Sequence, residues 1–244
     1  MKIKNSALRI ATWVVVLVAC LSPAWASERA DEVKRIQASA DVLDEIMAAP
    51  DKGRPQEIME SAVCVGVVPS VKKGGFIVGA EYGKGVATCR TSTGWSAPAP
   101  FKAVGGSWGL QFGGEAVDLF MLIMNKNGME KLLSSKFKLG ADASAAAGPV
   151  GRHAEGDTDW KLQAEVLTYS RARGLFAGVT LNGAVVQQDG DATRALYGHD
   201  TSFRAILQGS VSAPSGSEPF LAAVRKLAAQ AESAKVSEKR AEAR

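Results

Sequence analysis

A glycine-punctuated run of short apolar stretches, from Val63 to Arg90, constrains this chain more than any other segment. Residues 62–68 form an apolar stretch that ends at Pro69, and residues 76–82 and 86–90 flank Gly83-Lys84-Gly85. Short β-prone stretches bounded by glycine are typical of antiparallel strands joined by turns. We therefore expect a hairpin here, with Gly83–Gly85 as its turn.

The β-pattern continues further along the chain. Residues 107–112 alternate large apolar side chains with small or polar ones, which predicts a strand with one buried face. Residues 116–124 are almost continuously apolar, which favours a central strand, with a helix as the alternative. Residues 165–169, 175–181 and 184–188 predict a meander, and Asn182-Gly183 is a strong hairpin signal because both residues tolerate positive φ.

Helical patterns flank these strands. Residues 27–49 carry apolar side chains every three or four positions, and this amphipathic helix could pack on the sheet or lie in a membrane interface. Its many acidic residues favour packing on the sheet. Short helices are expected at 126–133 and 191–197. The expected fold class is α+β, with a mainly antiparallel, glycine-rich, barrel-like sheet and the helices packed on it.

Three further segments complete the expected organisation. Residues 28–208 form one folded domain, residues 209–217 a flexible linker, and residues 218–244 a C-terminal helical tail. Residues 1–26 have the order of a secretory signal peptide, with cleavage after Ala26. The alternative is a lipoprotein signal that ends before Cys20, which would then be lipidated. We expect an exported protein, periplasmic or extracellular, or one held in the envelope by a lipid on Cys20.

Net charge bears on the class of binding partner, and the cysteines on a possible disulfide. The formal net charge is +4, and the signal segment holds three cations and no acid, which leaves +1 for the mature chain. Nucleic acid is therefore not an expected partner, because it would require a strongly basic chain or patch. Cys64 and Cys89 are the cysteines of the mature chain. They form a disulfide if their strands are neighbours, and are two buried thiols otherwise.

No motif for catalysis or for a cofactor is present. His153 and His199 lie in expected loops without a nucleophile motif nearby, so a hydrolase that uses either of them is the weakest hypothesis. The cysteines and histidines do not have metal-ligand spacing. The stretch from Gly79 to Gly85 lacks the spacing and the hydroxyl residue of a phosphate-binding loop. We expect no enzyme activity, no metal and no cofactor.

Positive charge is concentrated near the middle of the chain. Residues 126–138 contain four lysines, and in the run 136–139 the alternation places Lys136 and Lys138 on one face of a strand. Such a face could contact anionic head groups, at about 1 kcal/mol per lysine near a charged surface. Lys72 and Lys73, at an expected turn, could join it. The alternative is a strand face that merely contacts solvent.

Several segments together resemble the SYLF domain family in order and spacing. The segments are 68–85 (VPSVKKGGFIVGAEYGKG), 94–101 (GWSAPAPF), 105–125 (GGSWGLQFGGEAVDLFMLIMN), 136–152 (KFKLGADASAAAGPVGR) and 169–186 (YSRARGLFAGVTLNGAVV). The resemblance covers roughly residues 30–198. It implies a phospholipid-binding domain without enzymatic activity, to which eukaryotic members add actin binding and modules such as SH3 or FYVE domains.

The leading hypothesis is therefore an exported, non-enzymatic protein that binds anionic phospholipid head groups or membrane surfaces. The residues expected to contact head groups are Lys131, Lys136, Lys138 and Arg152, with Lys72 and Lys73 as second choices. The alternative is a structural or protein-interaction module whose partner is an envelope protein.

Overall fold

The computed structural model describes residues 27–48, 58–74, 78–108, 117–148, 164–172, 175–179 and 181–242. Its centre is a curled ten-stranded sheet in the order β6-β10-β4-β2-β1-β5-β8-β7, with β3 beside β2 and β9 beside β8. All pairings between these strands are antiparallel except that of β7 with β8. The strands are β1 (Cys64–Gly74), β2 (Val78–Thr91), β3 (Gly94–Trp95), β4 (Ala99–Trp108), β5 (Val117–Ile123), β6 (Lys136–Lys138), β7 (Ala145–Ala147), β8 (Val166–Ala172), β9 (Leu175–Gly178) and β10 (Val185–Gln188).

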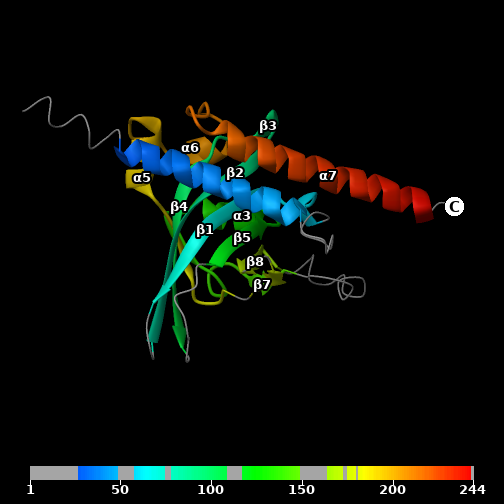
Figure 1. Cartoon of the computed structure of the whole chain (residues 1–244), viewed down its shortest axis with the longest axis horizontal. Helices are drawn as coiled ribbons and strands as arrows, with labels where there is room; N and C mark the ends of the chain where they lie inside the picture. The colour runs from blue at the N-terminus through cyan, green and yellow to red at the C-terminus, as the bar shows by residue number, and fades with distance from the viewer. Residues whose placement is uncertain are drawn as a thin grey trace, which may run out of the picture.

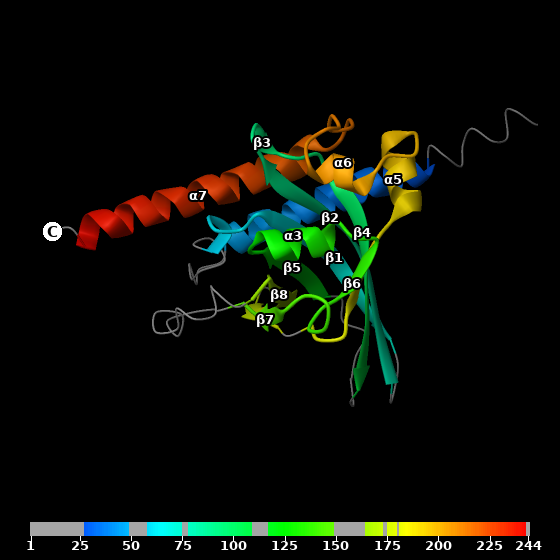
Figure 2. The same cartoon turned by 180° about the vertical axis from the view of Figure 1, so that it is seen from behind.

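Helices cover both faces of this sheet, so the predicted α+β class is confirmed. The N-terminal helix (residues 27–48) and α7 (Glu218–Glu242) lie side by side across one face, which we call the outer face (Figure 1). On the other face, the inner face, lie α3 (Lys126–Leu132) and α6 (Phe203–Leu207) (Figure 2). The remaining helix, α5 (Gly190–Tyr197), follows β10 directly.

The N-terminal helix packs on the sheet, as its pattern predicted. Ile36 and Leu43 are completely buried in the core of the outer face. Ion pairs fix the helix from both sides, since Glu45 contacts Arg171 of β8 and Asp44 lies 3.0 Å from the ammonium group of Lys226 on α7. Among the described residues, no helix is both long enough and apolar enough to cross a bilayer.

The expected turn at Gly83-Lys84-Gly85 is wrong. Strand β2 continues through these residues and pairs with β4 from Val78 to Ala87. The glycines serve a close approach of strands instead, because a Cβ atom at Gly83 would overlap the Val68 side chain and one at Gly85 would overlap the Val67 carbonyl oxygen. Lys84 is therefore a strand residue with a defined direction rather than the tip of a turn.

The central strand is confirmed, but the meander is only partly correct. The apolar run around residue 120 forms β5, which is buried between β1 and β8. Asn182 and Gly183 do form a turn, with Gly183 at φ +90°. The strands on either side of it do not pair with each other, however, because β9 pairs with β8 while β10 pairs with β4 and β6. Turn chemistry is local, and the choice of strand partner is set by the rest of the sheet.

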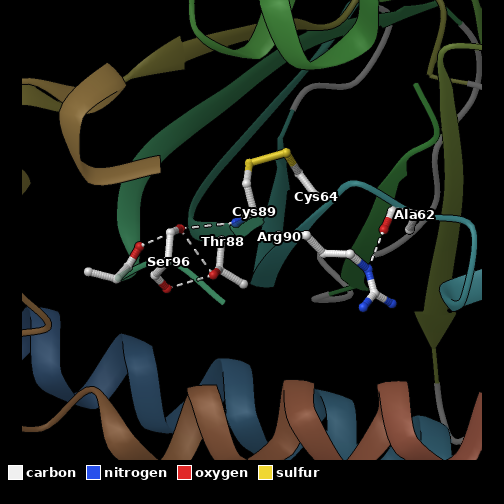
Figure 3. The surroundings of a disulfide bond; sticks show 7 residues. Ala62, Cys64, Thr88, Cys89, Arg90 and Ser96 are labelled. Atoms are coloured by element: carbon white, nitrogen blue, oxygen red, sulfur yellow. Dashed lines mark hydrogen bonds between the residues drawn. A yellow bond between two sulfur atoms is a disulfide. The ribbon is translucent and has the colours of Figure 1, made fainter. Parts of the chain in front are cut away.

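A disulfide joins Cys64 of β1 to Cys89 of β2, which are register partners and are fully buried (Figure 3). Hydrogen bonds surround this point. The Ser96 hydroxyl accepts from the backbone N–H of Cys89 at 3.0 Å, and the Arg90 guanidinium donates to the carbonyl oxygen of Ala62 at 2.9 Å. The disulfide thus links two central strands at the end where the helices cover them.

Removal of this disulfide should lower stability without changing the fold. The two cysteines are 25 residues apart, and closing a loop of that length in the unfolded chain corresponds to about 3 kcal/mol. We expect the double variant Cys64→Ala, Cys89→Ala to unfold at a lower urea concentration and with a larger m-value, because the unfolded chain without the crosslink is more expanded. Titration of free thiols in the wild type is the control, and an unchanged urea midpoint would contradict the prediction.

Candidate functional site

Strand register gathers four lysines on the outer face of the sheet. Lys84 of β2 lies opposite Lys102 of β4, Lys102 lies opposite Gln187 of β10, and Gln187 lies opposite Lys136 of β6. Register partners in antiparallel strands point to the same side of the sheet. Lys138, two residues after Lys136, therefore shares this side. We call Lys84, Lys102, Lys136 and Lys138 the lysine face.

The alternate residues of the same strands confirm the direction. Phe101, Phe137 and Val186 are buried in the core of the inner face, so their neighbours in sequence point outward. In the described part of the chain, the core of the outer face contains no residue of β4, β10 or β6. The lysine face therefore lies beside this core and not within it, and Lys84 and Lys102 are partly exposed. Lys136 and Lys138 are exposed, and neither has a salt-bridge partner among the described residues.

Two exposed apolar side chains lie next to these lysines. Tyr82 and Val104 are register partners on β2 and β4, and the same row continues through Val185 to Lys138. Tyr82 is 42% exposed and Val104 41%. Of the large hydrophobic side chains in the described residues, the only other one that is exposed is Val236 on α7. Cationic and apolar groups are thus presented together on one surface.

A buried carboxylate contacts two lysines of the lysine face, Lys84 and Lys102. Asp189 follows β10, caps α5 by accepting a hydrogen bond from the backbone N–H of Ala192, and is completely buried. The ammonium group of Lys102 lies 3.0 Å from one of its oxygens, and that of Lys84 lies 3.3 Å from the other. Lys84 and Lys102 would repel each other across the strands without this carboxylate.

The charge of Asp189 is stable at neutral pH. Burial alone would raise the pKa of this carboxyl, but the hydrogen bonds from Lys102 and the Ala192 amide, together with the charge of Lys84, outweigh burial and lower the pKa. The hydrogen bond to Asp189 also raises the pKa of Lys102 above its usual value. Asp189 and Lys102 are therefore both ionised in the physiological range.

A pocket of about 240 Å³ adjoins the lysine face, where the N-terminal helix meets β1 and β2. Arg35, Ser70, Tyr82 and Lys84 supply its polar groups. Arg35 pairs with Glu32 on the helix, and burial lowers the pKa of its guanidinium. The Ser70 and Tyr82 hydroxyls have no hydrogen-bond partner among the described residues. The pocket therefore offers two cations and two hydroxyls to a small anionic group.

A bulge in β1 shapes the wall of this pocket. Ser70 has a φ of +57°, which is unusual for a residue with a side chain, and the pairing of β1 with both neighbours shifts register around it. The backbone N–H of Ser70 donates to Asp118 at 2.9 Å, and Asp118 is held in turn by Arg171. This network fixes the bulge against β5 and β8.

The residues expected from the sequence fall into three groups. Lys136 and Lys138 lie together on the lysine face. Lys131 is exposed on α3, which packs against the inner face, and Arg152 lies outside the described residues. Lys72 and Lys73 lie in β1, opposite Tyr82 and Glu81, so their backbones are close to the lysine face, although their side chains are outside the described part.

Sequence reasoning missed Lys84, Lys102 and Arg35. Lys84 was assigned to a turn, and Arg35 was considered only as part of an amphipathic helix. A signal for Lys102 did exist, since it alternates with Phe101 and Ala103 in the manner of an outward-facing strand residue. Helix α5 was expected at residues 191–197 and is found at Gly190–Tyr197, with Asp189 as its N-cap.

The structure offers no catalytic arrangement in the part of the chain it describes. His199 is exposed and contacts the Thr201 hydroxyl at 3.3 Å, while His153 lies outside the described residues. No group of three or more histidine, cysteine or acidic residues that could hold a metal ion occurs among the described residues.

Comparison with known proteins gives the family. A family model named Ysc84 and described as "Las17-binding protein actin regulator" matches residues 104–227, about half of the chain. The chain belongs to this family, whose domain is the SYLF domain. The matched segment begins within β4, after Lys102, and includes β6 and β10, so it contains Lys136 and Lys138 of the lysine face.

Curated relatives agree with this assignment. The human SH3 domain-containing YSC84-like protein 1 is 33% identical over 171 residues, which cover 69% of this chain and 50% of the relative. Protein YSC84 of Saccharomyces cerevisiae is 32% identical over 176 residues, or 70% of this chain and 37% of the relative. The SH3 domain-containing protein PJ696.02 of Schizosaccharomyces pombe is 35% identical over 158 residues, or 63% and 37%. The chain spans half or less of the length of these relatives.

Removing the charge of Asp189 should destabilise the domain in a pH-dependent manner. Asparagine can still cap α5, so the variant Asp189→Asn removes only the charge. Lys84 and Lys102 then lie opposite each other without a counter-charge. We expect a loss of about 2 kcal/mol at pH 7, less than for a fully buried pair because both lysines are partly exposed. Urea unfolding of the variant and the wild type measures this difference.

The pH dependence follows from the lowered pKa of Asp189. A depressed carboxyl pKa contributes stability that is present above the unfolded-state value near 3.9 and is lost as pH falls through the folded-state value. The stability gap between wild type and Asp189→Asn should therefore be constant from pH 5 to 8 and shrink below about pH 4. A gap that stays the same at pH 3 would contradict this account.

Proposed function

We propose that this domain binds anionic membrane surfaces through the lysine face. The observation that carries the proposal is the combination of Lys136 and Lys138, exposed and without salt-bridge partners in the described part of the chain, with the exposed Tyr82 and Val104 beside them. Lysines attract anionic head groups, and tyrosine is favoured at the boundary between head groups and acyl chains. A face designed only for solvent would not need the apolar pair.

Membrane contact is proposed to occur in a defined orientation. The lysine face spans four adjacent strands, so its lysines can approach a membrane surface together. The pocket lined by Arg35 and Lys84 would then lie at the edge of the contact and accept a head-group phosphate, for which arginine is well suited. Lys72, Lys73 and Arg152 remain predicted contacts, whereas Lys131 lies on α3 on the other side of the sheet, so the proposed contact does not include it.

The proposed role is non-enzymatic and exported. The chemistry available in the described residues is ionic and apolar contact, without a nucleophile and base arranged together. Export is proposed from residues 1–26, which have the order of a signal peptide, either removed after Ala26 or cut before a lipidated Cys20. A lipid on Cys20 would add a second membrane attachment to the weaker one made by the lysine face.

A protein partner is the second candidate function. The matching family model is described as "Las17-binding protein actin regulator", so binding of a protein is part of what that family name records. For this chain, an envelope protein would take the place of the lipid on the same face. Copurification of a partner without any affinity for vesicles would favour this second candidate.

Charge reversal on the lysine face should abolish vesicle binding. Loss of Lys136 and Lys138 removes about 2 kcal/mol of attraction, or about thirtyfold in partitioning, and two new carboxylates add repulsion. We expect Lys136→Glu, Lys138→Glu to fail to float with vesicles of phosphatidylcholine and phosphatidylglycerol at low salt, where the wild type floats.

The matched control lies on α3, which packs on the inner face. Lys126→Glu, Lys131→Glu makes the same change in net charge at two exposed lysines that have no salt-bridge partner among the described residues. It should bind nearly as well as the wild type. Equal losses in the two double variants would mean that net charge alone governs binding, and the lysine face would not be a site.

The apolar part of the contact has its own test. Tyr82→Ser should leave the salt dependence of binding unchanged but weaken binding at every salt concentration, because an exposed aromatic ring contributes through burial in the interface. Vesicle flotation from low to high ionic strength measures both quantities. If Tyr82→Ser bound as tightly as the wild type throughout, the apolar pair would have no part in the site.

A further inference from the structure

The lysine face contains two kinds of lysine. Lys136 and Lys138 are exposed and have no salt-bridge partner among the described residues. Lys84 and Lys102 have side chains only 33% and 26% exposed, and both ammonium groups contact the buried carboxylate of Asp189. All four lysines lie on the outer face of the sheet. We call Lys136 and Lys138, which are free to contact a ligand, the outer lysines, and Lys84 and Lys102, which are paired with Asp189, the inner lysines.

Asp189 has more contacts than a helix cap requires. One oxygen accepts from the Ala192 backbone N–H at 3.2 Å and also contacts Lys102, which is enough to cap α5. The other oxygen is buried, has no hydrogen-bond partner among the described residues, and lies 3.3 Å from the Lys84 ammonium, which is longer than a good charged hydrogen bond. The Lys84 contact is therefore the weaker of the two, and Lys84 also lines the pocket with Arg35.

We propose that Asp189 is a built-in counter-ion of the lysine face, which holds Lys84 and Lys102 against the sheet until an anionic ligand competes for them. Without ligand, the face presents the charge of Lys136 and Lys138 and hides much of the charge of the inner pair. An anionic head group in the adjacent pocket draws Lys84 away from its long contact with Asp189. The inference rests on the proposed function for its ligand and adds how the affinity of the face is set.

This arrangement makes surfaces of low negative charge density poor ligands. A ligand gains the inner lysines only if its charge competes with a carboxylate that is already in place, so a surface of low charge density meets only the outer pair. The affinity should therefore rise more steeply with the fraction of anionic lipid than it would for four independent lysines. Because the hydrogen bonds from Lys102 and Ala192 and the charge of Lys84 outweigh burial and keep Asp189 ionised, the restraint persists at neutral pH.

The variant Asp189→Asn tests the proposal on vesicles. Asparagine retains the cap on α5 but releases both inner lysines, so we expect about fivefold tighter binding to vesicles of phosphatidylcholine and phosphatidylglycerol, with a steeper dependence on salt. Asp200→Asn is the matched control, since this exposed carboxylate contacts Arg194 and neither inner lysine. Asp189→Asn binding that is equal to or weaker than that of Asp200→Asn would overturn the proposal.

A second measurement does not depend on lipid. An amine-reactive acetylating reagent, followed by mass spectrometry, gives the labelling rate of each lysine in the folded protein. We expect Lys84 and Lys102 to react more slowly than Lys136 and Lys138 in the wild type, and to accelerate in Asp189→Asn but not in Asp200→Asn. Unchanged rates for the inner pair in Asp189→Asn would overturn the counter-ion even if vesicles are bound.

The two measurements separate the inference from the proposed function. Wild-type protein that ignores anionic vesicles while Lys84 and Lys102 are released in Asp189→Asn would reject the proposed ligand and keep the counter-ion. If Asp189→Asn does not fold, Lys102→Gln replaces it, because a withheld lysine should matter less than an open one. Lys102→Gln should then weaken vesicle binding less than Lys136→Gln does, and an equal or larger loss would overturn the proposal.

Discussion

The candidate site depends on the register of β2, β4, β10 and β6. Antiparallel pairing places register partners on the same side of a sheet, so Lys84, Lys102 and Lys136 lie in one row although they are far apart in sequence. A shift of one residue in any of these pairings would turn a lysine inward and an apolar side chain outward. The buried Phe101, Phe137 and Val186 oppose such a shift. The packing of the inner face therefore keeps the lysines on the outer face.

Close packing of glycines sets this register where β1 meets β2. Gly83 and Gly85 let the bulged part of β1 approach β2 more closely than any side chain would allow. Lys84 lies between them and is thereby directed to the outer face, next to Arg35 of the N-terminal helix. The disulfide between Cys64 and Cys89 joins the same two strands further along. Covalent and steric constraints on β1 and β2 thus support the part of the site that is nearest the helix.

Much of the fold could be predicted from sequence, and the site only in part. Periodicity identified the N-terminal helix and β5, and alternation put Lys136 and Lys138 on one face. Local signals failed where a residue serves a distant contact. Gly83-Lys84-Gly85 has the composition of a turn, but its glycines accommodate β1. Asn182-Gly183 forms a turn, but the strands it connects pair elsewhere. Lys102 and Asp189 belong to the site only through strand pairing, which a single sequence does not reveal.

The central claim is that the lysine face itself meets the membrane. Gln187 lies in the middle of this face, is exposed, and is opposite both Lys102 and Lys136. A spin label on Gln187→Cys, in the mature chain with its disulfide intact, should lose mobility and become accessible to a lipid-soluble relaxation agent when anionic vesicles are added. A label on Glu130→Cys of α3, beneath the inner face, should not change. If the label at residue 130 entered the membrane and the label at residue 187 did not, membrane contact through the lysine face would be contradicted.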